Sequence, residues 1–196
     1  MKKVRVLFLV ALTSLHTAAH ADVIISFQEV GSDVVASYSG SLDLTGASPV
    51  SSGQNANVVY LWPAQSQFYS FSRSVGNYDG WLFPSVVVPT FGTGSMGIGN
   101  ANLTTGFNFS FDNAGGGNGI GVTSGYTSGA AFAGSATFEN ATFSSLGITP
   151  GTYTWTAGNN NMTLTTQAVP EPATSAMAFV GLAYGTYSMF RRRKQA

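Results

Sequence analysis

Few residues in the central part of this chain could carry acid–base or nucleophilic chemistry. Residues 22–169 contain no histidine, cysteine or lysine. This composition excludes Ser-His and Cys-His nucleophilic systems and zinc sites built on those ligands. Paired carboxylates, as in glycoside hydrolysis, are the chemistry that remains, with Asp79, Asp112 and Glu139 as candidates. Because acids in turns and on exposed strand faces are common, we expect no catalytic residue, metal site or cofactor.

A second candidate is the glycine spacing of Gly92, Gly94 and Gly97, which matches the dinucleotide-binding fingerprint. That mechanism needs a helix N-terminus directly after the loop to hold the pyrophosphate. Residues 98–106 are rich in Gly, Asn and Thr, which are poor helix formers. We therefore interpret the match as accidental. The glycine-rich residues 113–121 predict a loop.

The aromatic residues offer a binding function instead of a reaction. Trp62, Trp81, Trp155 and several tyrosines could stack on sugar rings if they lie on an exposed face. The alternative, which the sequence favours, is that they fill the core. An exopolysaccharide is thus one candidate partner.

The charge of the central part argues against nucleic acid as a partner. Residues 22–169 hold seven acids and one base, Arg73, for a formal charge of −6. The other basic residues lie at the two ends of the chain. A nucleic-acid-binding surface needs a basic patch, which these residues do not supply.

The elements that must position these residues are predicted to be strands. Short runs of aromatic, β-branched and threonine residues alternate with turn residues, and Phe107, Phe109 and Phe111 alternate with polar residues, the period of a strand buried on one face. Pro84 marks an edge or a break. We expect one all-β domain over residues 22–168, an antiparallel β-sandwich or jelly-roll-like fold. The strands are expected at residues 23–29, 34–38, 57–62, 67–73, 81–88, 152–156 and 162–166. Turn residues at 31–33 and 158–161 predict that the first two and the last two of these strands form hairpins.

The N-terminus has the three parts of a secretory signal peptide. Basic residues at positions 2, 3 and 5 precede an apolar segment at residues 6–15. Ala19 and Ala21 flank His20 in the small-x-small pattern of a cleavage site. We expect residues 1–21 to be removed; an uncleaved anchor is the alternative, which the short apolar run disfavours.

The C-terminus predicts one membrane-spanning helix. Residues 173–190 are 18 uncharged residues, which as a helix would extend about 27 Å and can just cross a bilayer core of about 30 Å. A buried amphipathic helix is disfavoured because no charged face is present. The basic run that follows would stop transfer and stay cytoplasmic, which places the body on the other side of the membrane. This run is Arg191, Arg192, Arg193 and Lys194.

Pro170, Glu171 and Pro172 stand immediately before the predicted span, and the two prolines keep the glutamate in an extended segment. This motif, the span and the basic run together resemble the PEP-CTERM sorting signal, over residues 169–194. The resemblance implies recognition by an exosortase-type membrane protease, transient anchoring in the inner membrane, and then a place on the cell surface or outside the cell.

The same resemblance implies a Gram-negative bacterium that makes an extracellular polysaccharide. Residues 135–138 and 146–155 are also similar to a pattern that recurs just before such tails. From the sequence we therefore expect a non-enzymatic surface or extracellular-matrix protein, with a polysaccharide-binding module as the alternative.

Overall fold

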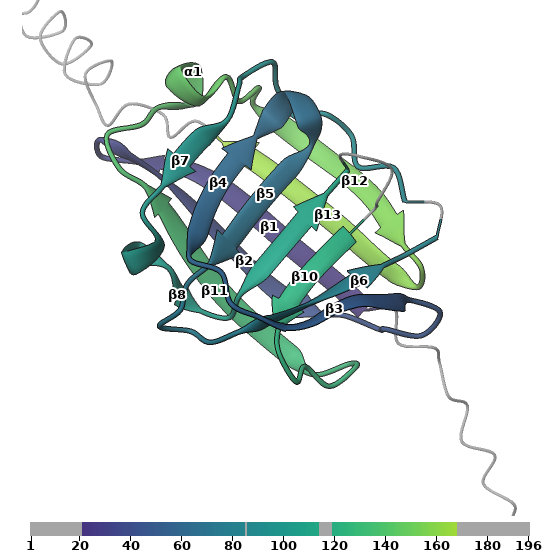
Figure 1. Ribbon diagram of the computed structural model, residues 1–196. Helices are drawn as coiled ribbons and strands as arrows, with labels where there is room; N and C mark the ends of the chain where they lie inside the picture. The colour runs from purple at the N-terminus through teal and green to yellow at the C-terminus, as the bar shows by residue number, and fades with distance from the viewer. Residues whose placement is uncertain (1–20, 85, 114–118, 168–196) are drawn as a thin grey trace, which may run out of the picture.

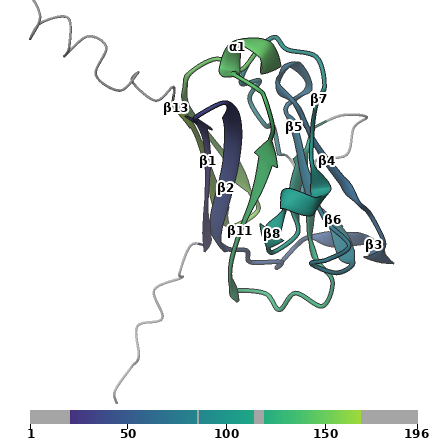
Figure 2. The same ribbon diagram turned by 90° about the vertical axis from the view of Figure 1, so that its left-hand side faces the viewer.

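The computed structural model describes residues 21–84, 86–113 and 119–167. Within these ranges the chain forms two stacked β-sheets with very little helix, as expected for an all-β sandwich (Figures 1 and 2). Residues 1–20 of the predicted signal peptide and the predicted membrane span at residues 173–190 lie outside the described residues. No helix in the described residues is long and apolar enough to cross a membrane.

Sheet A has six strands and contains both the first and the last strand of the domain. In spatial order they are β12 (Gly151–Ala157), β13 (Asn160–Gln167), β1 (Ala21–Val30), β2 (Asp33–Ser41), β11 (Ala131–Phe138) and β8 (Thr105–Gly106).

Sheet B has seven strands and faces sheet A across the core. Their spatial order is β3 (Ser48–Gln54), β6 (Tyr78–Leu82), β10 (Gly119–Thr123), β9 (Phe109–Asp112), β5 (Gln67–Phe71), β4 (Val58–Trp62) and β7 (Gly97–Gly99). Two 3-10 turns, at Pro63–Gln65 and Ala101–Leu103, and a four-residue helix, α1 (Phe143–Leu146), connect the strands.

Local turn chemistry explains the two hairpins that the sequence predicts. β1 and β2 pair in antiparallel fashion around Gly31, which has a positive φ of 64°. β12 and β13 pair around Gly158 and Asn159, and Gly158 has a φ of 59°. Glycine at the first of two turn residues is typical of the tight hairpin turn that matches the strand twist.

One strand pair departs from the antiparallel arrangement that we expected. β1 runs parallel to β13, with Ala21 opposite Asn160 and Gln28 opposite Gln167. The expectation of a purely antiparallel sandwich is therefore wrong at this pair. Parallel neighbours need a long connection, and here it is most of the domain.

Three strand predictions also need correction. The strand expected at residues 81–88 is β6, which ends at Leu82, before Pro84. Gly119 and Gly121, which we expected in a loop, belong to β10. The strand through Phe109 and Phe111 is buried on both faces, because Asn108 and Ser110 are buried as well.

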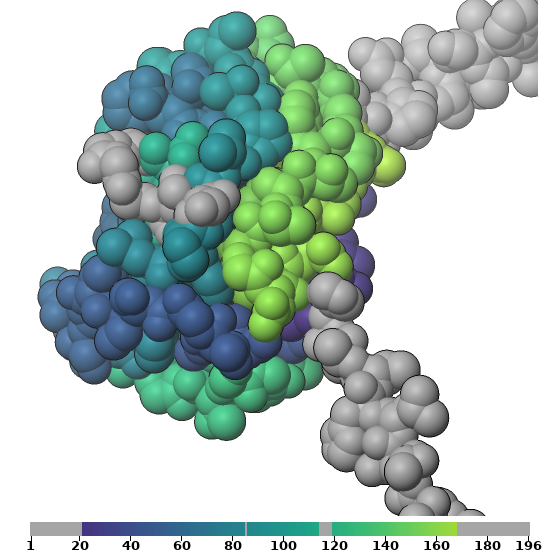
Figure 3. Space-filling model, turned by 90° about the vertical axis from the view of Figure 1, so that its right-hand side faces the viewer, coloured from purple at the N-terminus to yellow at the C-terminus, as the bar shows by residue number. Residues whose placement is uncertain are grey.

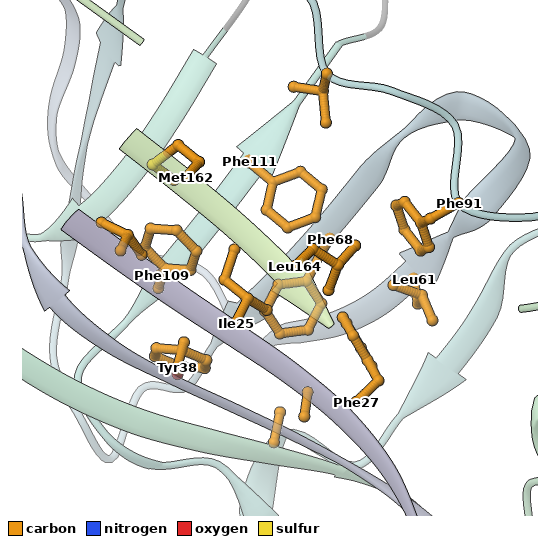
Figure 4. Packing of buried hydrophobic residues seen from close by; sticks show 14 of the residues in the cluster. Ile25, Phe27, Tyr38, Leu61, Phe68, Phe91, Phe109, Phe111, Met162 and Leu164 are labelled. Carbon is orange, nitrogen blue, oxygen red and sulfur yellow. The ribbon is translucent and has the colours of Figure 1, made fainter. Parts of the chain in front are cut away.

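The core lies between the sheets, and its largest fully buried side chains are phenylalanines (Figure 4). Phe27 from sheet A contacts Phe68 from sheet B edge-to-face, with ring centroids 5.3 Å apart. Phe68 is fully buried and also contacts Tyr38 and Phe111. Burial raises the pKa of Tyr38 to about 12 against the opposing effect of its hydrogen bond with Ser70. These rings hold the two sheets together.

Phe68→Ala tests this core contact. We expect it to lower the free energy of unfolding by about 3–5 kcal/mol, because the truncation leaves a cavity between the sheets. The measurement is urea unfolding followed by tryptophan fluorescence. Ile98→Ala is the control, because the Ile98 side chain is 73% exposed; equal unfolding midpoints for the two variants would contradict the assignment.

Candidate functional site

The outer face of sheet B carries aromatic side chains that do not belong to the core. Side chains alternate between the two faces of a strand, so the residues that alternate with core Phe68 and Phe111 face away from sheet A. Tyr69 lies between Ser110 of β9 and Tyr60 of β4 in the strand register. All three therefore share the outer face.

Two pairs of stacked rings form on this face. Tyr60 and Tyr69 stack with centroids 4.5 Å apart and planes 20° apart. Phe71 and Tyr78 stack at 4.1 Å and 10°. Phe71 is buried, whereas the three tyrosines are half-buried. Part of each tyrosine thus remains accessible to a ligand.

Glycines leave space beside these rings. Gly80 of β6 lies opposite Gly121 of β10, directly next to Ser110. A Cβ at Gly121 would come within 2.6 Å of the Phe71 ring and 2.5 Å of the Ser110 hydroxyl. Position 121 must therefore be glycine for the Phe71 ring to lie against β10.

An open cleft of about 290 Å³ lies on this face beside Tyr69, Tyr78 and Gly121. We call it the outer cleft. Its volume is at the lower end of the range for ligand sites, about 300–1,000 Å³. The residues that line it come from β3, β6, β10, β9 and β5: Val50, Ser51, Tyr69, Tyr78, Gly80, Trp81, Leu82, Ser110, Asp112, Gly119, Ile120 and Gly121.

Asp112 organises the polar part of the outer cleft. Its Oδ2 accepts a hydrogen bond from the Tyr69 hydroxyl at 2.5 Å, and its Oδ1 accepts one from Gln67 Nε2 at 2.8 Å. Burial and the bond to Asp112 both raise the pKa of Tyr69, so this hydroxyl stays protonated. Burial also raises the pKa of Tyr60. The outer cleft thus presents a carboxylate and hydroxyl groups, fixed by hydrogen bonds, beside aromatic rings.

The three candidate carboxylates are not brought together. Asp79 accepts hydrogen bonds from the backbone N–H groups of Gly53 and Gly125 at 2.7 and 2.9 Å, and so joins β3 to the turn that follows β10. Glu139 accepts from the Asn100 amide at 3.0 Å. Among the described residues that line the outer cleft, Asp112 is the only carboxylate. No cluster of three or more His, Cys, Asp or Glu side chains suitable for a metal occurs in the described part of the chain.

The three tryptophans take different places, which the sequence could not distinguish. Trp155 is 8% exposed and packs in the core against Phe111, with ring centroids 5.3 Å apart. Trp62 and Trp81 are half-buried, and Trp81 lines the outer cleft. The expectation that tryptophans fill the core therefore holds for Trp155 and only in part for the other two.

The glycine fingerprint is explained by packing. A Cβ at Gly92 or Gly94 would collide with the backbone carbonyl of Gly147 or Leu146, respectively. The N–H groups of Thr93 and Gly94 donate to the Gly147 carbonyl at 3.0 and 3.2 Å. β7 follows this loop, so the helix N-terminus that a dinucleotide site needs is not present here.

The predicted sorting and stop residues lie outside the described residues, as does Ala19. These are Pro170, Glu171, Pro172, Arg191, Arg192, Arg193 and Lys194. Ala21 is the first residue of β1 and is 6% exposed. After the predicted cleavage, β1 would begin at Asp22, whose Oδ1 accepts a hydrogen bond from Asn161 Nδ2 at 2.9 Å.

Comparisons of this chain with protein-family models, curated proteins and solved structures found no match. The resemblance of residues 169–194 to a sorting signal therefore stays a prediction. The interpretation of the outer cleft rests on its geometry.

The hydrogen bonds that Asp79 accepts can be tested by substitution. Burial opposes the charged form, but hydrogen bonds from Gly53, Gly125 and Ser124 outweigh it and lower the pKa of Asp79. Asp79→Asn should therefore destabilise the fold at pH 7, by about 1 kcal/mol or less because Asp79 is only half-buried and solvent screens its charge.

The sign of the pH dependence follows from the lowered pKa. The stabilisation is present above the unfolded pKa of about 3.9 and is lost as the pH falls through the lower folded value. Urea unfolding from pH 6 to pH 2 should show the two proteins converging at the acidic end. A difference that is constant with pH would rule out a role for the Asp79 charge.

Proposed function

We propose that this chain is an exported, non-enzymatic surface or matrix protein whose β-sandwich binds a neutral polysaccharide in the outer cleft. The observation that supports the binding function is the set of accessible tyrosines beside fixed hydrogen-bonding groups on a solvent-facing sheet. Exposed aromatic surface is unfavourable in water and often marks a binding site.

The chemistry of the outer cleft matches that of a sugar. A sugar ring has an apolar C–H face that can stack on an aromatic ring, and hydroxyl groups around its edge. Tyr69 and Tyr78 supply rings, while Ser51, Ser110 and Asp112 supply polar groups beside them. A mostly apolar concave surface with a few placed polar groups is typical of small-ligand sites.

Charge favours a neutral glycan over an acidic one. The described lining of the outer cleft contains one carboxylate, Asp112, and no cationic side chain. Arg73, the one base in residues 22–169, is exposed and is not among the lining residues. A uronate group in the outer cleft would meet the negative charge of Asp112, and the described lining residues offer no cationic side chain to bind the uronate.

A binding role without catalysis is supported by the arrangement of the carboxylates. Glycoside hydrolysis requires two carboxyl groups about 5–10 Å apart, on either side of the bond to be cut. Among the described lining residues Asp112 is the only carboxylate, and Asp79 and Glu139 accept hydrogen bonds from Gly53 and Asn100 instead.

Export and sorting are proposed from the sequence of the two ends. Residues 1–21 would direct secretion, and residues 173–190 would anchor the chain briefly in the inner membrane. Pro170, Glu171 and Pro172 would present an extended segment to an exosortase-type protease outside the membrane. The protein would then reach the cell surface or the extracellular matrix, where polysaccharide is available.

Polysaccharide binding can be measured by the tryptophan fluorescence of the purified chain, because Trp81 lines the outer cleft. Tyr78→Ala should weaken binding by about tenfold or more, which corresponds to about 1.4 kcal/mol. Tyr153→Ala is the matched control, a half-buried tyrosine of sheet A. The panel should include neutral glucans and mannans and a uronate-rich polymer.

The expected result is a spectral shift with one or more neutral polymers and none with the uronate polymer. Equal affinities of the two variants would place binding elsewhere. For polymers of the panel that are insoluble, binding is measured by retention of the protein on the solid polymer. An unchanged spectrum with every soluble polymer and no retention on any insoluble one would refute the binding function.

Sorting can be tested by processing in a host that has an exosortase-type protease. Glu171→Ala, or replacement of the four terminal basic residues by glutamine, should leave unprocessed or misrouted precursor on an immunoblot. Glu139→Ala is the control. Normal processing of both tail variants would exclude the proposed signal, without bearing on the outer cleft.

A further inference from the structure

The edges of the two sheets are protected to different extents. An exposed strand edge presents unpaired N–H and C=O groups, and proteins blunt such edges with short strands, proline, charge or bulges. β8 has only two residues and β7 only three. β3 contains Pro49 and two register shifts against β6. Three of the four edges therefore carry a recognised protective feature.

The fourth edge, β12, carries none of these features. It is seven residues long, keeps a regular register with β13, and contains neither proline nor a charged residue. Thr152, Thr154 and Thr156 are exposed, and Figure 3 shows this side of the molecule with β12 and its hairpin (light green to yellow) at the surface. Threonine and aromatic residues also favour the extended conformation.

The register defines which backbone groups face outward. The hairpin loop has two residues, so Ala157 and Asn160, which flank it, form a hydrogen-bonded pair. Such pairs alternate along an antiparallel ladder. The N–H and C=O groups of Thr152, Thr154 and Thr156 therefore point away from β13. Among the described strands, β13 is the only partner of β12.

We propose that β12 pairs with β12 of a second copy of this chain, in antiparallel fashion about a two-fold axis at Thr154. In this register Thr154 lies opposite Thr154 of the copy, and Thr152 lies opposite Thr156. Each of the three threonines then exchanges its outward backbone hydrogen bonds with a threonine. The two copies of sheet A become one continuous sheet, and the interface has the self-complementarity that two-fold symmetry requires.

The absence of charge and the exposed threonines of β12 favour a second copy of this chain as the partner at this edge. Identical surfaces that meet across a two-fold axis bring like charges together, but β12 and β13 contain no charged residue. Paired threonines on the outer face make favourable cross-strand contacts. The residues that follow β13 in the sequence include Pro170 and Pro172, which cannot donate to a ladder, so that segment is a poor alternative.

A single introduced cysteine tests the symmetry axis. The chain has no cysteine of its own, so a disulfide in a single-cysteine variant must join two copies. Opposed residues of a hydrogen-bonded antiparallel pair have Cα atoms about 5.5 Å apart, within the range for a disulfide. The full chain, purified in detergent micelles, should give a disulfide-linked dimer with Thr154→Cys on mild oxidation. Thr163→Cys, one strand further in on the same face, should give none above background.

The register has its own control. Thr152→Cys and Thr156→Cys should each fail to cross-link alone, because the axis separates equivalent positions by more than about 13 Å. A mixture of the two variants should give the mixed dimer. Cross-linking of each variant with itself, and not in the mixture, would overturn the proposed register.

The cysteine-free chain provides an independent measurement. Thr154→Lys should abolish the dimer in sedimentation equilibrium, because two lysines would meet at the axis, while circular dichroism confirms that the fold is intact. A monomeric wild-type chain overturns the proposal. A dimer that survives Thr154→Lys, with no excess cross-linking at Thr154→Cys, also overturns it and assigns association to another part of the chain.

Discussion

The parallel pairing of β1 with β13 is the contact on which the rest of the domain depends. It joins the first and the last strand over eight residue pairs, from Ala21–Asn160 to Gln28–Gln167. The hairpin of β12 and β13 is attached to sheet A through this pair alone. Because the two strands run parallel, the described chain enters at one end of sheet A and leaves at the other. The pairing also makes β12 an outer strand.

Sheet B shows how a sandwich can carry aromatic residues on both faces. Its inner face supplies Phe68, Phe109 and Phe111 to the core, while its outer face supplies Tyr60, Tyr69 and Tyr78. The outer rings stack on neighbours, and the polar atoms between them are hydrogen-bonded. Asp112 gives the Tyr69 hydroxyl a fixed acceptor, so the cleft is ordered before any ligand arrives. Such preorganisation reduces the entropy cost of binding.

Local signals in the sequence predicted the parts of the fold that depend on local contacts. The turns at Gly31 and Gly158 and the break at Pro84 follow from the conformational preferences of glycine and proline. β3 and β11 escaped prediction because Ser, Gly and Ala dominate them and their pairing is with distant strands. Gly119 and Gly121 indicated a loop, since nothing local reveals that Phe71 will lie against Gly121.

Composition alone excludes the chemistries that need histidine, cysteine or lysine, because residues 22–169 contain none of the three. The sequence by itself also determined the two hairpins, because a turn residue and its flanking strands are neighbours along the chain. Which aromatic residues face the core and which line the outer cleft depends on how the two sheets pack against each other. Alternation assigns side chains to two faces, but when both faces carry aromatic residues, only the position of the other sheet defines the inner one. The parallel contact of β1 with β13 was likewise decided by the tertiary structure, because its partners are more than a hundred residues apart.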